Sequence, residues 1–265
     1  MIKIKFCHTI KARKKHEFEE VFYEKKLTAI ILPLILLIAF FSYYWYAEVS
    51  IEDSNLREAL KQNIGKLNRA NLHDITTLDL SNCNIKNLDG VQNLKNINHL
   101  CLSNNQIKEI KYINNLNIDS LDLSNNKIDN IPKLNLPKLR ILDLSGNNIS
   151  DIQNISNIIS LEDLVLSDNN IYNICELTNL PNLTLLDLNL NDLSSIDGIE
   201  NIKTLKSLFI GGNDIHYINS ISNLSNLEEL ILSENQNITE PIPIEYLKKL
   251  QSLEMKSTNI ENIIQ

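Results

Sequence analysis

The sequence is poor in cysteine, glycine and proline. Its 265 residues include four Cys, six Gly and six Pro, while 43% are hydrophobic. So few cysteines exclude a disulfide scaffold, and the abundance of branched aliphatic residues excludes a collagen-like or disordered chain. Basic residues are also a minority, with 25 Lys and Arg against 33 Asp and Glu. Because a nucleic-acid binder needs a basic face that displaces counterions, we expect no nucleic-acid partner.

The basic residues that are present gather at the amino terminus. Residues 1–26 hold eight basic and four acidic side chains, a net charge of +4 in a chain whose total is −8. We interpret this segment as a basic leader that stays in the cytoplasm. It either lies on anionic lipid as a short amphipathic helix or serves only to fix the membrane topology.

A run of twenty-one uncharged residues follows, from Leu27 to Ala47. At about 1.5 Å rise per residue, a helix of this length spans roughly 30 Å, the thickness of the hydrocarbon core of a bilayer. Phe, Tyr and Trp crowd its far end, as they do where a helix meets the lipid headgroups. The run therefore predicts a transmembrane signal-anchor helix over residues 27–47.

The flanks of this run predict its orientation. The basic leader precedes it, whereas Glu48, Glu52 and Asp53 follow it. This asymmetry predicts a single-pass protein of the cell membrane, with the amino terminus in the cytoplasm and the later residues outside. A cleaved signal peptide is the alternative. A cut after Ala47 would, however, put Trp45 at a position where a small side chain is needed.

Beyond residue 74 the chain repeats itself. The pattern LxxLxLxxN recurs at spacings of 21 to 23 residues, which is typical of leucine-rich repeats. Such units stack into a solenoid, because no single coil can bury its apolar residues alone. We therefore predict an α/β leucine-rich repeat solenoid over residues 75–265, with a curved parallel sheet on the concave face and short helical or 3-10 turns on the convex face. The nine units begin at Ile75, Ile97, Ile118, Leu139, Leu161, Leu183, Leu205, Leu227 and Leu250.

The ninth position of the unit is almost always asparagine, with Cys83 in the first unit and Thr258 in the last. A buried side-chain amide at this position can satisfy backbone groups where the chain leaves each strand. We interpret the column as a structural ladder and not as a catalytic set. The ladder consists of Asn105, Asn126, Asn147, Asn169, Asn191, Asn213 and Asn235.

Residues 48–74 predict a linker and a helical cap that shields the first coil. Asn55 can act as the N-cap with Glu58 three residues later, and Gly65 can end the helix. Leu56 and Leu60 would share one helical face with Ile64. We expect this face to cover the exposed core of the first repeat.

The cap followed by ITTLDLSNCNIKNLDGVQNLKNINHLCLSNNQIKEI resembles the internalin-type leucine-rich repeat proteins of Gram-positive bacteria over residues 51–265. The resemblance implies a non-enzymatic surface protein that holds another protein against its concave sheet. Many internalin-like proteins also carry a cell-wall anchoring signal, and no LPxTG-like motif occurs here. We therefore expect attachment through the amino-terminal helix. The short repeat also resembles intracellular phosphatase-regulatory subunits, so the fold alone does not fix the compartment.

Function is expected on the concave face, which the third and fifth residues of each unit build. In units four to eight five of these residues are apolar, and four acidic ones border them. An apolar strip with a polar rim is typical of a protein-binding surface, and Phe209 is the expected main contact. Outward β-branched residues can also serve strand formation alone. The predicted ligand-binding residues are Ile141, Asp143, Asp163, Val165, Leu185, Asp187, Phe209, Glu229 and Ile231.

Other chemistry is weakly indicated. His99 and Cys101 alternate onto the concave face between Asp79 and Asp122, but one such pair on an open sheet lacks the converging ligands of a metal site or a catalytic triad. We therefore expect no enzyme, cofactor or metal. The four cysteines are too dispersed to predict a pairing.

These observations predict a membrane-anchored protein-protein interaction module, an adhesion or receptor-like protein with a protein ligand. A cytosol-facing scaffold or regulatory subunit of an enzyme, such as a phosphatase, is the alternative. The last strand offers an uncovered pairing edge, which suggests a homodimer through the carboxy-terminal end of the sheet.

Overall fold

The computed structural model describes residues 25–238 and 240–259, and the described chain falls into two units that divide after Glu48. The first unit contains one helix, Lys25–Tyr46, which is long and apolar enough to cross a membrane. Residues 1–24 of the basic leader and residues 260–265 of the ninth repeat lie outside the described residues.

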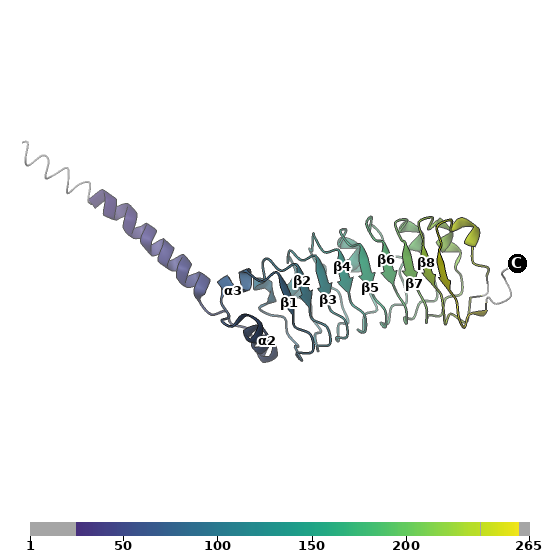
Figure 1. The fold of residues 1–265 in the computed structure, drawn as a ribbon, viewed down its shortest axis with the longest axis horizontal. Coiled ribbons are helices and arrows are strands. Elements are labelled where there is room, and N and C mark those ends of the chain that lie inside the picture. Colours follow the sequence, from purple (N-terminus) through teal and green to yellow (C-terminus); the bar gives the residue numbers. More distant parts are fainter. Residues whose placement is uncertain (1–24, 239, 260–265) are drawn as a thin grey trace, which may run out of the picture. The chain divides into compact units, whose positions relative to one another are not determined.

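The second unit is a leucine-rich repeat solenoid, as the sequence predicted (Figure 1). Within the described residues, nine short parallel strands form one sheet in the order β1 to β9. Each strand consists of the third to fifth residues of its repeat, so the register of the sheet follows directly from the repeat spacing. The strands are β1 Thr77–Asp79, β2 His99–Cys101, β3 Ser120–Asp122, β4 Ile141–Asp143, β5 Asp163–Val165, β6 Leu185–Asp187, β7 Ser207–Phe209, β8 Glu229–Ile231 and β9 Ser252–Glu254.

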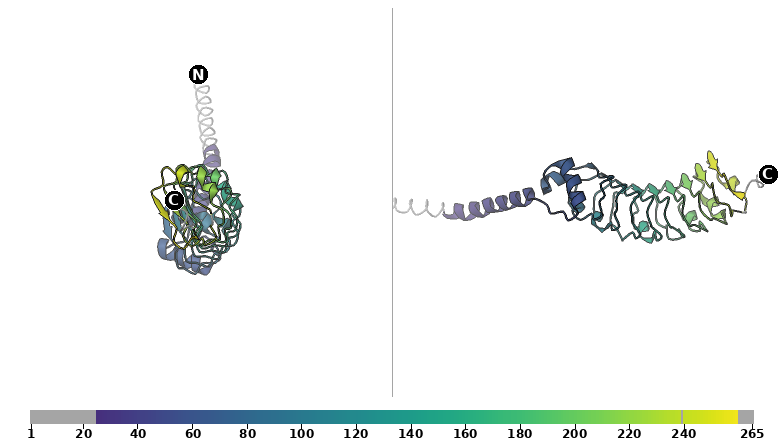
Figure 2. Two further views of the ribbon diagram at one scale, coloured as in Figure 1. Left: turned by 90° about the vertical axis from the view of Figure 1, so that its right-hand side faces the viewer. Right: turned by 90° about the horizontal axis from the view of Figure 1, so that it is seen from below.

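The solenoid is an arc with the strands along its inner side (Figure 2). The return segments on the outer side are irregular, with short 3-10 turns in six of the described repeats. A strand spacing of about 4.8 Å on the sheet side and bulkier turns opposite make such a stack curve. The turns are η1 Val91–Asn93, η2 Lys111–Ile113, η3 Gln153–Asn157, η4 Ile199–Asn201, η5 Asn219–Asn223 and η6 Ile244–Tyr246.

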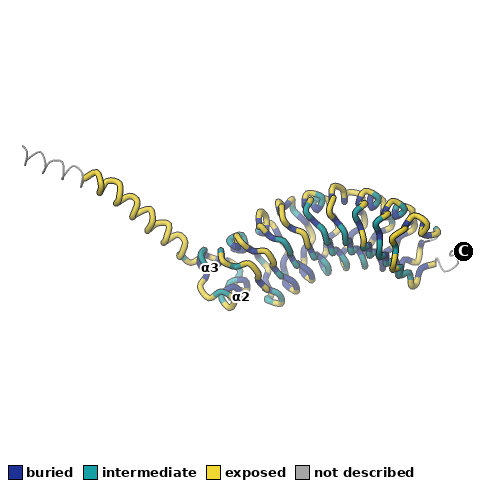
Figure 3. The backbone as a smooth tube through the Cα atoms, turned by 45° about the horizontal axis from the view of Figure 1, so that its top comes forward, coloured by how far each residue is buried: buried dark blue, intermediate teal, exposed yellow. Residues whose placement is uncertain are grey.

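One continuous apolar core runs the length of the solenoid, from Val49 to Leu247. Figure 3 shows the buried residues inside each coil and the exposed residues at its outer turns. In the repeat that begins at Leu161, β5 contributes the buried Leu164, and Leu166 directly after it is also buried. The return segment contributes the buried Ile171, Ile174, Leu177 and Leu180. Leucine at these positions is therefore explained by stacking alone.

The ninth-position asparagines are buried and join each repeat to the one before it. The Nδ2 group of Asn169 donates to the carbonyl oxygens of Leu144 at 3.0 Å and Leu166 at 3.1 Å, and its Oδ1 accepts the backbone N–H of Ile149 at 3.0 Å. The same bonds recur from Asn105 to Asn235. Each side chain thus satisfies backbone groups that no strand partner reaches.

The eighth position of every repeat has a left-handed backbone, with φ between 53° and 64°. This conformation turns the chain out of the strand toward the buried asparagine. Such a φ favours Gly, Asn and Asp over other residues. The series is Asn82, Asn104, Asn125, Gly146, Asp168, Leu190, Gly212, Glu234 and Ser257.

The cap contains helix α2, Ser54–Ile64, and helix α3, Arg69–His73. The predicted N-cap was wrong: Asp53 caps α2, and its Oδ1 accepts the backbone N–H groups of Asn55 at 2.9 Å and Leu56 at 3.0 Å. The aspartate wins because it lies just before the helix in an extended conformation, whereas Asn55 is already inside the first turn. Gly65 ends the helix at φ 74°, as predicted.

Candidate functional site

The concave face of the sheet carries two parallel columns of outward side chains. The register pairs Ile141, Asp163, Leu185, Ser207 and Glu229 in one column. It pairs Asp143, Val165, Asp187, Phe209 and Ile231 in the other. All nine predicted ligand-binding residues therefore lie on one surface, over β4 to β8.

The apolar residues do not form the straight strip that the sequence suggested. In β4 to β6 they change column from strand to strand, so Val165 has Asp143 and Asp187 as its neighbours in register. Only Phe209 and Ile231 stand side by side in one column. The surface is therefore a checkerboard of apolar and acidic side chains that ends in an apolar pair.

These side chains differ in exposure. Ile141 is 39% exposed, whereas Val165, Leu185, Phe209 and Ile231 are half-buried. Strand formation alone can account for half-buried apolar side chains on the outer face of a sheet. Their outer surfaces nevertheless face the solvent, so they remain available to a partner.

Four of the outward aspartates have a structural role that sequence reasoning missed. Asp79, Asp122, Asp143 and Asp187 occupy the fifth position, and in each one Oδ1 accepts the backbone N–H two residues later at 2.9 Å. An Asx turn of this kind holds the chain where it leaves the strand. The recurring Asp-Leu-Ser triplet was the signal that could have revealed it.

The apolar exceptions to this rule are Val165, Phe209 and Ile231. Each occupies a fifth position where an aspartate would cap the following turn, as in the strands on either side of Val165. The three residues therefore replace a local hydrogen bond with exposed apolar surface. Departures from a local structural rule concentrate at functional sites.

One carboxylate on this face, Asp187, has a raised pKa. Burial raises the pKa of its carboxyl above the ordinary 3.8, and the nearby charge of Asp143 adds to the rise. The backbone N–H of Asn189 and the side chain of Ser167 act in the opposite direction. A carboxylate in this setting gains from any cation that approaches it.

The two remaining predicted acids make weaker contacts within the sheet. Asp163 accepts a hydrogen bond from the Thr184 hydroxyl at 3.4 Å, and Glu229 accepts one from the Ser207 hydroxyl at 3.4 Å. Neither bond compensates a full negative charge. Both carboxylates can therefore also interact with groups outside the chain.

Two leucine-rich repeat family descriptions match the sequence. "Leucine Rich repeats (2 copies)" matches residues 116–157, and "Leucine Rich Repeat" matches residues 74–94. No curated protein matches the chain. Among solved structures, internalin C2 of Listeria monocytogenes is 29% identical with a TM-score of 0.70, and the match covers 77% of this chain and 93% of that one. The chain is an internalin-like leucine-rich repeat protein.

Plant receptor ectodomains share the fold of this internalin-like protein. The HAESA ectodomain of Arabidopsis, in complex with an extended IDA peptide hormone, is 29% identical with a TM-score of 0.58, over 68% of this chain and 34% of that one. The GASSHO1/SCHENGEN3 ectodomain of Arabidopsis thaliana, in complex with CASPARIAN STRIP INTEGRITY FACTOR 2, is 26% identical with a TM-score of 0.52, over 63% and 22%. The chain thus spans a third or less of these ectodomains.

One exposed residue at the exit of the sheet escaped the sequence reasoning. Leu190 of the internalin-like chain follows β6, has a left-handed backbone and is 55% exposed. The next repeat carries Gly211 and Gly212 at the corresponding two positions, where four of the nine repeats have Ser followed by Asn or Asp. An apolar residue at a position that favours Asn and Gly is the signal that could have identified it.

The three described cysteines of the internalin-like protein are not paired with one another. Cys83, Cys101 and Cys175 are free thiols, and Cys7 lies outside the described residues. Burial raises the pKa of the Cys101 thiol, which weakens it as a nucleophile. Among the described residues, no group of three or more His, Cys, Asp or Glu side chains could hold a metal ion.

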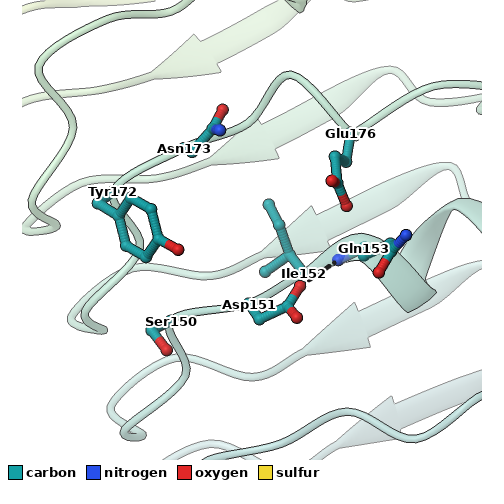
Figure 4. A pocket seen from close by; sticks show the side chains of 7 residues that line it. All are labelled: Ser150, Asp151, Ile152, Gln153, Tyr172, Asn173 and Glu176. Carbon is teal, nitrogen blue, oxygen red and sulfur yellow. Dashed lines mark hydrogen bonds between the residues drawn. The ribbon is translucent and has the colours of Figure 1, made fainter.

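A small hollow lies away from the sheet, between the return segments of two repeats (Figure 4). It measures about 120 Å³, and Asp151, Tyr172 and Glu176 supply most of its functional groups. In the close-up, the Asp151 carboxylate faces the backbone of Gln153, which donates to it at 2.9 Å. The hollow is too small for a drug-sized ligand, so the concave face remains the candidate site.

Proposed function

We propose that this chain is a membrane-anchored interaction module that binds a protein ligand on the concave face over β4 to β8. The observation that carries the proposal is the set of apolar exceptions at the fifth position, Val165, Phe209 and Ile231. At the fifth position of these strands, an apolar side chain stands where other strands have an aspartate that caps the following turn. Contact of this apolar side chain with water is unfavourable. A protein partner that covers the three side chains supplies the compensating free energy.

The relatives support the same reading. The HAESA and GASSHO1 ectodomains each form a complex with a peptide or protein factor. This chain shares their fold, and its own parallel sheet presents outward side chains at a fixed spacing. The described residues supply no set of converging nucleophile, base and oxyanion donors, so the proposed role is binding and not catalysis.

The concave-face proposal can be tested with a photo-crosslinker on intact cells. Replacing Phe209 with benzoylphenylalanine keeps an aromatic ring at the site and places the reactive group on the concave face. The matched control places the same residue at Ile159, which is 53% exposed and lies outside the strands. We expect protein adducts at position 209 and none at position 159. Equal labelling, or labelling at 159 alone, would reject the concave face as the binding surface.

We further propose that the helix Lys25–Tyr46 anchors the chain in the cell membrane, with the repeats on the outer side. The helix has the length and composition of a membrane span, and the basic leader precedes it. Outside the cell the free thiols would be exposed to oxidation, but solenoid stacking does not depend on them.

Protease treatment of intact cells that express a carboxy-terminally tagged chain tests this topology, with lysed cells as the control. We expect the tag to be lost from intact cells. Protection in intact cells with loss after lysis would place the repeats in the cytoplasm and support a scaffold or regulatory subunit instead. Release of the repeats into the medium would indicate a cleaved signal peptide.

A further inference from the structure

Three apolar residues with some exposure occur on consecutive repeats, the sixth to the eighth. Phe209 and Ile231 are adjacent in the register of β7 and β8. Leu190 lies where the chain leaves β6, and its backbone N–H donates to the carbonyl oxygen of Gly211 at 2.8 Å. Leu190 is thus hydrogen-bonded to the segment that follows β7, the strand that ends with Phe209 and pairs with the strand of Ile231.

Leu190 occupies this place at a conformational cost. Its φ of 54° brings the β-carbon of an L-residue close to the following carbonyl, and a branched aliphatic side chain gains no local hydrogen bond in return. The side chain is nevertheless 55% exposed, so burial in the core does not offset the strain. The fold needs the left-handed backbone at this position but not the leucine, which points to a role of this side chain outside the fold.

The following repeat makes room for Leu190. A β-carbon on Gly212 would come within 2.6 Å of Leu190 Cδ2, and one on Gly211 would come within 2.9 Å of the Ser233 carbonyl oxygen. Two of the six glycines of the whole chain are therefore placed together at this exit. Gly212 therefore leaves the space that the Leu190 side chain occupies, whereas Gly211 is confined by the Ser233 carbonyl group.

Within the two outward columns of the sheet the charges have one sign, although Lys256, just past β9, donates to Glu254 at 2.9 Å from outside the columns. The two outward columns of the sheet contain seven acidic residues, five at the fifth position and two at the third, and no Lys or Arg. Asp187 is the register neighbour of Phe209, and Glu229 lies in the same strand as Ile231. The Asp187 carboxylate is partly desolvated and lies near the charge of Asp143, so an approaching cation stabilises it. Lys206 and Arg140 stand at strand entrances, outside the two columns.

We infer that the concave face binds a basic polypeptide segment with an apolar anchor residue, and that Leu190, Phe209 and Ile231 hold that anchor. This inference rests on the proposed function, because it specifies the partner of the same surface. The three apolar side chains provide the buried centre, and Asp187 and Glu229 pair with Lys or Arg side chains on either side of the anchor. A polycation without an apolar side chain would engage the carboxylates and leave the anchor residues unused.

The probe is a random library of displayed dodecapeptides, panned against the full chain in lipid nanodiscs. Recovered peptides are then synthesised with a fluorophore, and their affinity is measured by anisotropy. We expect enrichment of sequences in which one Leu or aromatic residue is flanked by Lys or Arg. Replacing the basic residues of such a peptide with Glu should weaken binding at least tenfold, and added salt should weaken the original peptide through its association rate.

Two variants distinguish a loss of peptide binding from a loss of folding stability. Leu190→Asn places the residue that other repeats prefer at a left-handed position, so the melting temperature should hold or rise while peptide affinity falls about fivefold. Phe209→Ser should lower affinity about tenfold or more. The matched control, Ile159→Ser, removes an exposed apolar residue that lies outside the strands and should leave affinity unchanged.

The outcomes distinguish this inference from the broader proposal. Peptides that are neutral or acidic but still depend on Phe209 would overturn the inference and leave the concave binding site standing. Basic peptides that bind Leu190→Asn and Phe209→Ser as well as the original chain would overturn the anchor and indicate binding by charge alone. Recovered peptides that are insensitive to every concave variant, or no enrichment at all, would count against both.

Discussion

At the residue scale, the geometry that recurs in each coil depends on a few polar side chains inside an apolar stack. The Asn169 amide uses both of its ends, donating to three carbonyl groups and accepting one N–H group. An aliphatic residue of the same volume would leave these backbone groups buried without partners. The asparagine column is therefore a requirement of the fold, as its spacing in the sequence had predicted.

Replacing Asn169 with alanine tests this requirement. We expect the free energy of unfolding to fall by about 3 kcal/mol, because several buried backbone groups lose their partner at once. Urea denaturation of the full chain in detergent measures the change. Asn170→Ala is the matched control: this neighbour is exposed, its backbone bond to Ile149 survives, and its cost should stay within about 0.5 kcal/mol. Similar losses for both variants would refute a specific role of the buried amide.

The candidate site could be predicted from the sequence only in part, also for reasons at this scale. Alternation along a strand was enough to assign Phe209 and Ile231 to the concave face, because the side-chain period of a strand is two. It did not reveal that Asp143 and Asp187 cap the next turn, since a ligand-binding aspartate and an Asx-turn aspartate look alike in sequence. Leu190 was missed because its position lies outside the strand and is defined by a backbone angle.

At the scale of elements, the cap helix and the first repeat share one carboxylate. Asp53 Oδ1 caps α2, and Asp53 Oδ2 accepts the backbone N–H groups of Lys86 and Asn87, each at 2.9 Å. Burial pushes the pKa of Asp53 upward, but these N–H donors outweigh it and hold the pKa below the ordinary 3.8. Asn55 adds a second link through its bond to the Asn84 carbonyl oxygen.

This link predicts a dependence of stability on pH. Because the folded state lowers the Asp53 pKa, ionised Asp53 favours folding above pH 3.8, and its contribution is lost as the pH falls through the lowered folded value. Asp53→Asn should therefore cost about 2 kcal/mol at pH 6 and progressively less below pH 4. Thermal melts of both chains across this range measure the difference.

Glu58→Gln serves as the control, because Glu58 lies on the exposed side of the same helix. Its stability difference from the original chain should be small and nearly independent of pH. A cost of Asp53→Asn that stays constant from pH 6 to pH 3 would mean that shape, and not charge, sets the role of Asp53.

Most of the strands were predictable, because the repeat spacing determines both the residues of the core and the register of the sheet. The leucine spacing sets which residues enter the core, and the same spacing sets the register of β1 to β9. The helix N-cap was less predictable, because Asp53 and Asn55 are both good capping residues two positions apart. The deciding contact is with Lys86 and Asn87, more than thirty residues away in the chain.

At the scale of the whole solenoid, each coil contacts only its neighbours. The stability of a coil therefore depends mainly on the coils directly beside it. The continuous core links cap and coils, yet a local defect should act mainly on the repeats nearest to it. Amide groups along the sheet report this directly. Leu80 donates to the Cys101 carbonyl near the cap, and Ile210 donates to the Ile231 carbonyl far from it.

Leu60→Ala in the buried face of α2 should therefore loosen the solenoid from its capped end. The cavity costs about 2 to 4 kcal/mol, so we expect exchange of the Leu80 and Leu102 amides to accelerate at least tenfold, with a much smaller effect at Ile210. Hydrogen exchange read by mass spectrometry resolves these segments. Leu164→Ala, in the middle repeat, is the control and should accelerate exchange on both sides of its own strand. If Leu60→Ala accelerated exchange equally along the sheet, the repeats would unfold as one cooperative unit, and the nearest-neighbour description would fail.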